Sequence, residues 1–462
     1  MRFYRSQSKR LLFSLMSKLI KNNKFLVLFL FILALLPRIV SVIFSNQVLL
    51  GDEVDYSQLA IQILEGKEYR SDFPLGFTNA RPPLYPLFIA VIYFFTNHSI
   101  LAAKLAQAVL GALICILVFF IAENIFKDRR ISFGAGVVCA IYPLSIIIGK
   151  SLLSETLFTF LLASAIFFLL RVHDQPNLKN KFFSGLFLGL VALTKPVILA
   201  FMPFLIPWLI LFLSGNASSR FKSATLIIIF MILTMMPWTI RNYIVFKEFM
   251  LVPTGSGVTF YVYNNENTLA KIHDPVIFVG ALPLTTDEQR KEMSLLSESD
   301  RDRYLYKLGW EFAKLHPKDF FKIRLISLGQ FWHFWPELPA RYKEYYAKEG
   351  AYRSPLLDKF VDTHLLYFIK ILYHLIYNIL FIGMFISITY SVRKRVEFRK
   401  SLLLIFLLIS VTLLHSIHGT DRYRLPTDPY VFLLGTHGLL TFFEREKRRT
   451  RISKLRNQVN YD

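Results

Sequence analysis

Long apolar segments recur along the whole chain, and they constrain its fold more than any other feature. A helix that crosses a bilayer needs about 20 mostly apolar residues. Seven segments reach or approach that length: residues 25–44, 105–122, 131–149, 196–213, 223–240, 371–392 and 401–417. Three shorter ones lie at residues 156–170, 182–194 and 429–443, where tilt or long flanking side chains can complete a crossing. The pattern predicts an all-α polytopic membrane protein with about 10–13 spans, extracytoplasmic loops and juxtamembrane helices.

The composition supports this class and argues against a soluble one. The 462 residues are 54% hydrophobic and 16% aromatic, as is typical of membrane proteins. The net charge of +22 first suggests nucleic acid as a partner. However, the basic residues gather next to apolar segments, at both termini and in short loops, as cytoplasmic flanks do under the positive-inside rule. We therefore expect contact with membrane lipids and no nucleic acid.

The basic loops also decide the topology. Loops at residues 127–130, 179–181, 220–222 and 393–400 are rich in Lys and Arg, and placing all of them in the cytoplasm gives ten crossings with both termini inside. Residues 47–81 then lie outside. Residues 83–95 are apolar but only 13 long, which favours an interfacial or re-entrant segment. The first apolar segment is predicted to be a membrane anchor, because no cleavage pattern follows it.

Five regions follow from this topology. Residues 1–24 form a basic cytoplasmic N-terminus, and residues 25–241 form a transmembrane catalytic module whose first outer loop covers residues 46–82. Residues 242–320 are polar and are predicted to be an extracytoplasmic insertion. Residues 321–443 form a C-terminal transmembrane and juxtamembrane region, and residues 444–462 form a basic cytoplasmic tail.

The same topology brings charged residues to the outer face from distant parts of the chain. The first carboxylates of the chain are Asp52, Glu53 and Asp55, which follow the first span directly. The other members of the set are Arg81, Glu155, Lys195, Arg241, Arg422 and Arg424. Charges near membrane depth cost about 2.5–3.5 kcal/mol each on insertion scales, so a group at one level indicates a functional site. The alternative to a functional site is that these residues only form ion pairs at the membrane interface.

The residue types point to a reaction class. A carboxylate among other charges can accept a proton from a hydroxyl or amine. Guanidinium and ammonium groups at headgroup level suit phosphate recognition. A base with a phosphate clamp on the outer face therefore fits group transfer from a lipid-phosphate donor.

Six short motifs then resemble those of one family, the GT-C fold glycosyltransferases of the protein-O-mannosyltransferase and aminoarabinose-transferase type (glycosyltransferase family 39-like). Residues 52–56, Asp-Glu-Val-Asp-Tyr, resemble the acidic signature of the first outer loop. Residues 80–86, Ala-Arg-Pro-Pro-Leu-Tyr-Pro, resemble the basic-Pro-Pro-Leu-Tyr element that closes it. Further matches lie at residues 154–158, 194–196, 237–243 and 422–426.

The resemblance implies an inverting enzyme that uses a polyprenyl- or dolichyl-phosphate-linked monosaccharide on the outer face. It implies Asp52 as the catalytic base, Glu53 as the group that orients the base or the acceptor, and Glu155 as the second acidic position. It places Arg81 on the donor phosphate and makes weaker phosphate or sugar contacts of Lys195, Arg241, Arg422 and Arg424. Candidate sugar or acceptor contacts are Asp55, Tyr56, Tyr85, Asn264 and Asn265.

One departure from the family concerns a metal. In aminoarabinose transferases an acidic residue precedes the basic-Pro-Pro element and helps bind the metal, and here that position is Ala80. No cofactor is therefore predicted, and a divalent metal is left open without a clear ligand set.

The resemblance leaves the acceptor open among an envelope glycan such as lipopolysaccharide, a lipid and a protein. The expected location is a bacterial inner membrane with the site facing the periplasm. A transporter or flippase of lipid-linked sugars is the competing hypothesis, and a non-catalytic assembly protein is the third.

Overall fold

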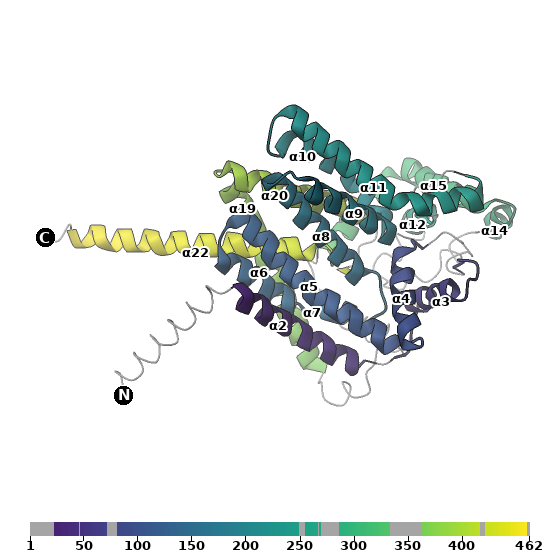
Figure 1. Ribbon diagram of the computed structural model, residues 1–462, viewed down its shortest axis with the longest axis horizontal. Coiled ribbons are helices and arrows are strands. Elements are labelled where there is room, and N and C mark those ends of the chain that lie inside the picture. The colour runs from purple at the N-terminus through teal and green to yellow at the C-terminus, as the bar shows by residue number, and fades with distance from the viewer. Residues whose placement is uncertain are drawn as a thin grey trace.

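The computed structural model describes residues 23–45, 47–71, 81–248, 255–266, 268, 286–332, 363–415 and 421–459. Across these residues the regular structure is helical throughout. Most of the basic N-terminus, as well as Ala80, lies outside the described part. Figure 1 shows the helices gathered in one bundle, with α22 extending beyond it at the C-terminal end.

The first half of the bundle surrounds α5 and α8. Its helices are α2 (Asn23–Ile43), α3 (Asp52–Leu64), α4 (Leu84–Thr96), α5 (Ile100–Phe126), α6 (Arg129–Ile141), α7 (Pro143–Gly149), α8 (Glu155–Asp174) and α9 (Leu178–Thr194). Several begin at a polar residue whose side chain caps the helix, as Ser99 does for α5 and Asn177 for α9. Pro143 separates α6 from α7 and bends their pair by 49°, because proline cannot continue the hydrogen bonding of the preceding helix.

The second half adds the polar insertion and the C-terminal helices. They are η1 (Pro196–Phe201), α10 (Met202–Phe212), α11 (Ala217–Phe246), α12 (Ser256–Val262), α14 (Asp287–Ser294), α15 (Glu298–Leu315), α16 (Pro317–Phe331), α19 (Thr363–Ser391), α20 (Arg395–His415), α21 (Asp421–Arg424) and α22 (Asp428–Val459). The described part of the insertion is helical, and α12 packs against α15. α22 continues from the last predicted span into the basic tail without a break.

Five described helices, α2, α5, α8, α11 and α19, are long and apolar enough to cross a membrane, and the bent pair α6–α7 would be a sixth span if its two helices cross together. They coincide with predicted segments 25–44, 105–122, 156–170, 223–240, 371–392 and 131–149. The other predicted segments are helical too, within α9, α10, α20 and α22, but their crossing stays a prediction. The predicted stretch 83–95 coincides with α4 (Leu84–Thr96), a short apolar helix.

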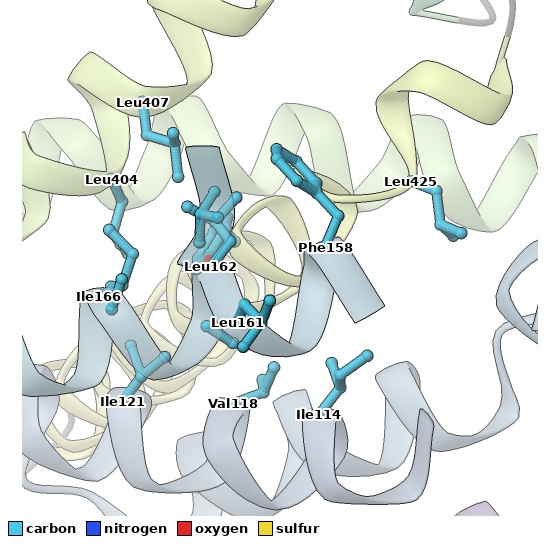
Figure 2. Packing of buried hydrophobic residues seen from close by; sticks show 14 of the residues in the cluster. Ile114, Val118, Ile121, Phe158, Leu161, Leu162, Ile166, Leu404, Leu407 and Leu425 are labelled. Carbon is cyan, nitrogen blue, oxygen red and sulfur yellow. The ribbon is translucent and has the colours of Figure 1, made fainter. Parts of the chain in front are cut away.

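The core lies between α5, α8 and α20. The apolar stretch of α8 is 78% buried, whereas that of α2 is 28% buried, so α8 is central and α2 peripheral. Figure 2 shows buried side chains from these helices pointing toward one another. They include Ile114, Val118 and Ile121 of α5, Leu161, Leu162 and Ile166 of α8, and Leu404 and Leu407 of α20. Such packing fixes where the two ends of α8 lie.

Glycines let α19 and α22 touch backbone to backbone. A Cβ on Gly438 would lie 1.8 Å from the carbonyl oxygen of Gly383, a distance that no side chain can accept. We expect Gly438→Ala to destabilise the protein by about 1–3 kcal/mol, the usual effect of overpacking. Thermal unfolding in detergent measures it. The matched control is Gly149→Ala, where the nearest atom is 3.9 Å away. Equal stability of the two variants would contradict this packing.

Candidate active site

The acidic cluster opens α3 immediately after the first predicted span. Gly51 has a φ of 52°, which glycine adopts without steric cost, and it turns the chain into the helix. Asp52, Glu53 and Asp55 occupy the first turn, where the helix dipole favours negative charge. Their side chains nevertheless point to different partners.

Arg81 joins two of these carboxylates. Its Nη2 lies 2.6 Å from Asp52 Oδ1, and its Nε lies 2.6 Å from Asp55 Oδ2. The Ser71 hydroxyl donates to the other Asp55 oxygen at 2.7 Å. The guanidinium also lies over the Tyr56 ring, 5.0 Å from its centre. Asp55, whose role was open in the sequence, therefore holds Arg81 beside Asp52.

Arg422 extends the network to the second acidic position. Its Nη2 lies 2.8 Å from Asp52 Oδ2, and its Nε lies 2.5 Å from Glu155 Oε1. Lys195 Nζ contacts the same Glu155 oxygen at 2.8 Å. Charges alternate from Asp55 through Asp52 and Glu155 to Lys195, from five separate parts of the chain. Glu155 begins α8, Lys195 follows α9 and Arg422 lies in α21.

The network is partly open to its surroundings. The side chain of Arg422 is 27% exposed and that of Asp52 is 12% exposed, whereas that of Glu155 is fully buried. Burial alone would raise the pKa of Asp52, but the positive charges of Arg81 and Arg422 outweigh it and hold this pKa well below its usual range. Asp52 is thus ionised in the resting site, and both of its oxygens are occupied.

One oxygen in the network has no partner. Glu155 Oε2 is buried and, within the described part of the chain, accepts no hydrogen bond. A buried charged acceptor left in this state is costly. It marks the place where a hydrogen-bond donor of a bound molecule is best accommodated.

Glu53 stands outside the network and supports the backbone. Its Oε1 accepts from the Leu152 amide at 2.5 Å, and its Oε2 accepts from the Leu50 amide at 3.2 Å. It thereby ties the start of α3 to the segment before α8. Its predicted role in orienting the base or the acceptor stays a prediction.

The two predicted tyrosines are framework residues as well. The Tyr56 hydroxyl lies 3.2 Å from the Ser154 hydroxyl, and the Tyr85 hydroxyl donates to Gln107 Oε1. Their rings meet edge to face, with centres 4.7 Å apart. Ser71 carries no distinctive signal in the sequence, and Ser154 is the first residue of the motif at residues 154–158 but was not predicted as a site residue.

Arg241 and Arg424 have other partners. Arg241 lies over the Trp238 ring at 4.8 Å and over that of Tyr69 at 5.8 Å, and the Tyr69 hydroxyl donates to the Arg81 carbonyl. Arg241 therefore borders the network through Tyr69. Arg424 is fully buried and pairs with Asp428 at 2.8 Å, so it belongs to a separate internal cluster.

Asn264 and Asn265 shape the end of α12. Asn264 donates to the Phe260 carbonyl at 2.6 Å and accepts from Arg324 at 2.9 Å. Asn265 donates to the Tyr261 carbonyl and accepts from the Thr268 amide. Both amide side chains are engaged in this turn, so a sugar would have to displace these bonds to reach them.

The chain is similar to known proteins in part of its sequence and in its fold. Residues 80–240 match the family model of dolichyl-phosphate-mannose-protein mannosyltransferase. The structure resembles that of the oligosaccharyltransferase AglB from Archaeoglobus fulgidus, solved with an inhibitory peptide and a dolichol-phosphate. That likeness has a TM-score of 0.52 and 16% identity, over 94% of this chain and 52% of that one. The chain has the GT-C fold. The predicted resemblance to GT-C fold glycosyltransferases and the predicted fold class are confirmed.

Two further structures belong to the same comparison. The A. fulgidus oligosaccharyltransferase in complex with Zn and sulfate has a TM-score of 0.52 and 15% identity, over 92% of this chain and 50% of that one. ArnT from Cupriavidus metallidurans bound to undecaprenyl phosphate has a TM-score of 0.42 and 14% identity, over 90% of this chain and 78% of that one. The GT-C chain described here thus spans about half the length of the oligosaccharyltransferase. No curated protein sequence matches it.

The acidic residues do not fit a metal. In the described part of the chain, no three His, Cys, Asp or Glu residues are placed to hold an ion together. Asp52 and Asp55 direct their oxygens at guanidinium groups, and Glu155 faces two cations. We therefore derive no step through a metal.

Proposed function

We propose that this GT-C protein is a glycosyltransferase that takes a monosaccharide from a polyprenyl- or dolichyl-phosphate donor. The acceptor is an envelope glycan, a lipid or a protein on the outer face of the membrane. The observation that carries the proposal is the continuous network of Asp52, Asp55, Glu155, Arg81, Lys195 and Arg422. The family match supports it, because residues 80–240 include three of these six side chains.

The guanidinium groups are the proposed phosphate contacts. Arg422 is the most exposed member of the network, and both arginines contact two carboxylates, Arg81 those of Asp52 and Asp55 and Arg422 those of Asp52 and Glu155. A donor phosphate would compete with Asp52 for both cations, since guanidinium binds phosphate and carboxylate in the same geometry. Lys195 completes the clamp beside Glu155, and Arg241 borders it.

The same competition would activate Asp52. A carboxylate with a strongly lowered pKa is a poor proton acceptor, and donor binding would withdraw the two charges that lower it. Asp52 would then take the proton of the acceptor hydroxyl or amine. The acceptor atom forms the new bond to the anomeric carbon, the bond from that carbon to the phosphate oxygen breaks, and polyprenyl phosphate leaves. A single displacement of this kind inverts the anomeric centre.

Glu155 is proposed to position a bound molecule. Its Oε1 is saturated by Lys195 and Arg422, while its Oε2 is free to accept a hydrogen bond. A sugar hydroxyl or an acceptor group would satisfy this oxygen. Glu155 thus links recognition of the ligand to the position of Arg422.

Arg81→Gln is expected to raise the KM for the donor by about 10- to 100-fold, the range for one lost hydrogen bond to a charged group. The measurement is initial rate against donor concentration in detergent. The matched control is Lys67→Gln, which removes an exposed cation of the same outer loop, paired only with Glu65 among the described residues. A donor KM that is the same in both variants would refute the phosphate role of Arg81.

Sugar transfer separates this function from a flippase. Purified protein is supplied with undecaprenyl-phosphate sugars labelled in the sugar, together with an envelope extract as the acceptor source. A transferase releases undecaprenyl phosphate and moves the label to another molecule. If the label crosses sealed vesicles without leaving its lipid, the protein is a flippase.

A further inference from the structure

A cavity with basic and aromatic side chains lies at the other end of the bundle. It has a volume of about 630 Å³ and lies between the end of α5, the end of α8 and the start of α9. Its lining includes three basic side chains, Lys127, Arg171 and Lys179. Nothing in the proposed transfer reaction uses them.

The cavity and the candidate active site are at opposite ends of the same helices. On α8, Glu155 and Arg171 are 16 residues apart, which corresponds to about 24 Å at the helical rise of 1.5 Å per residue. On and next to α9, Lys179 and Lys195 are separated by the same number of residues. Because α8 is long and apolar enough to cross a membrane, we expect the cavity and the active site at opposite membrane surfaces. Its basic loops are the ones predicted to be cytoplasmic.

The charge of the cavity is not balanced. Within the described chain, Lys127, Arg171 and Lys179 have no ion pair, and Arg171 makes only a long contact of 3.5 Å to Gln175. The one carboxylate of the lining, Glu123, accepts from the Ser132 hydroxyl at 2.9 Å. Three cations therefore face the cavity against one acid, and an anionic group would stabilise them.

A neighbouring acid is already neutralised. Asp174 ends α8 and lies 2.7 Å from Lys400 Nζ, which also donates to the Asn124 side chain at 2.8 Å. The ammonium is buried and the Asp174 side chain is 32% exposed, and together with Asn124 they join α8, α5 and α20 beside the cavity. The Lys400 ammonium neutralises Asp174, so this acid does not offset the three cations of the cavity.

The wall of the cavity is aromatic. Phe120, Phe167 and Phe168 line it, with the ring centres of Phe120 and Phe167 6.4 Å apart. Phe120 is 36% exposed and lies on a helix long and apolar enough to cross the membrane. Cations beside exposed aromatic rings, at the end of spanning helices, match a molecule with an anionic head and an apolar tail.

We infer that this cavity binds an anionic phospholipid of the leaflet opposite to the active site. Lys127, Arg171 and Lys179 would hold the phosphate head, and an acyl chain would lie against Phe120 and Phe167. A free phosphate would satisfy the cations but leave the aromatic wall without a partner. The inference does not depend on the proposed transfer reaction.

Native mass spectrometry of the full-length protein in detergent tests this site. Phosphatidylglycerol and phosphatidylcholine with the same acyl chains are added separately, and the bound fraction is measured. We expect phosphatidylglycerol to bind more tightly. Lys127→Gln, Arg171→Gln and Lys179→Gln combined should weaken its binding at least about tenfold, since each basic residue near an anionic surface contributes about 1 kcal/mol.

The control removes the same charge elsewhere. Lys447, Arg448 and Arg451 of the tail are exposed, and their triple Gln variant should bind phosphatidylglycerol as the wild type does. Equal losses in the two triple variants would show only a general charge effect and would overturn the inference. A wild type without preference for the anionic lipid would do the same.

Two further measurements keep the test valid if the triple variant misfolds, and they distinguish a bound phospholipid from a bound free phosphate. Phe120→Ala and Lys179→Gln alone change exposed side chains, and each should weaken phosphatidylglycerol binding if the triple variant does not fold. Glycerol 3-phosphate carries a phosphate group without acyl chains and should not displace the lipid at equal concentration. If it does, or if Phe120→Ala binds unchanged, the cavity is not a lipid site.

Discussion

Asp52→Asn is expected to lower the rate of sugar transfer by about 10²–10⁴-fold, the usual contribution of a general base. The amide keeps the size of the side chain but cannot take a proton from the acceptor. It also no longer attracts Arg81 and Arg422, which lie 2.6 and 2.8 Å from the carboxylate. The donor KM should therefore change far less than kcat, or even fall. The measurement is the rate of label transfer at saturating donor.

Two variants make this result specific. Glu65→Gln removes a carboxylate just beyond the end of α3, where Glu65 is paired with Lys67 at the surface, and should leave the rate unchanged. Asp55→Asn loosens Arg81 without removing the base, so it should act mainly on the donor KM. If the Asp52 variant keeps its full kcat, Asp52 is not the base.

Arg424→Leu is expected to destabilise the protein by about 3–5 kcal/mol, the cost of leaving one member of a buried ion pair alone. Arg424 and Asp428 are both fully buried. The guanidinium also donates to the Phe331 carbonyl at 3.0 Å and lies 3.9 Å from the centre of the Tyr377 ring. Loss of the arginine removes these contacts and the positive charge beside the buried Asp428 carboxylate, which keeps hydrogen bonds from the Tyr142 and Tyr377 hydroxyls. Thermal unfolding in detergent measures the effect.

A neighbouring arginine supplies the matched control. Arg422→Gln removes a partly exposed guanidinium two residues away, and it should impair transfer far more than it lowers the melting temperature. Replacing Arg424 and Asp428 together by leucine should cost less stability than Arg424→Leu alone, because no charge is left buried. A normally stable Arg424→Leu protein with weakened donor binding would instead support Arg424 as a phosphate contact.

The sequence predicted the long helices well because their signal is local. Runs of apolar residues define α5, α11 and α19 whatever surrounds them, since lipid requires each backbone group to bond within its own helix. The short apolar stretch at residues 83–95 is helical in the structure, but its predicted interfacial or re-entrant position stays a prediction. Whether α9, α10, α20 and α22 cross the membrane depends on tilt and on neighbouring helices, which a hydropathy pattern does not contain.

The sequence predicted which residues belong to the candidate site, but not which of them form ion pairs with one another. Topology placed Asp52, Arg81 and Glu155 on one face, and the structure brings them into one network. Which carboxylate meets which cation depends on the path of the chain between α3 and α8. This is why Asp55 proved to be a partner of Arg81, and why Glu53 bonds to backbone amides instead.

The surroundings of Arg424 were likewise not predictable from the sequence. It is two residues from Arg422, and the spacing to Asp428 fits one turn of helix. Only the tertiary structure surrounds it with Tyr142 and Tyr373 hydroxyls, both 3.1 Å away. A motif read as two equivalent basic residues thus contains one that faces the network and one that is buried in the core.

The mass of envelope components tests the central proposal most directly. Cells lacking the protein are compared with cells that carry the wild type or the Asp52→Asn variant, and glycans, lipids and proteins are measured by mass spectrometry. We predict one component that loses the mass of a single monosaccharide on deletion and regains it with the wild type only. Restoration by the Asp52→Asn variant, or no mass difference in any fraction, would contradict a glycosyltransferase that works through Asp52.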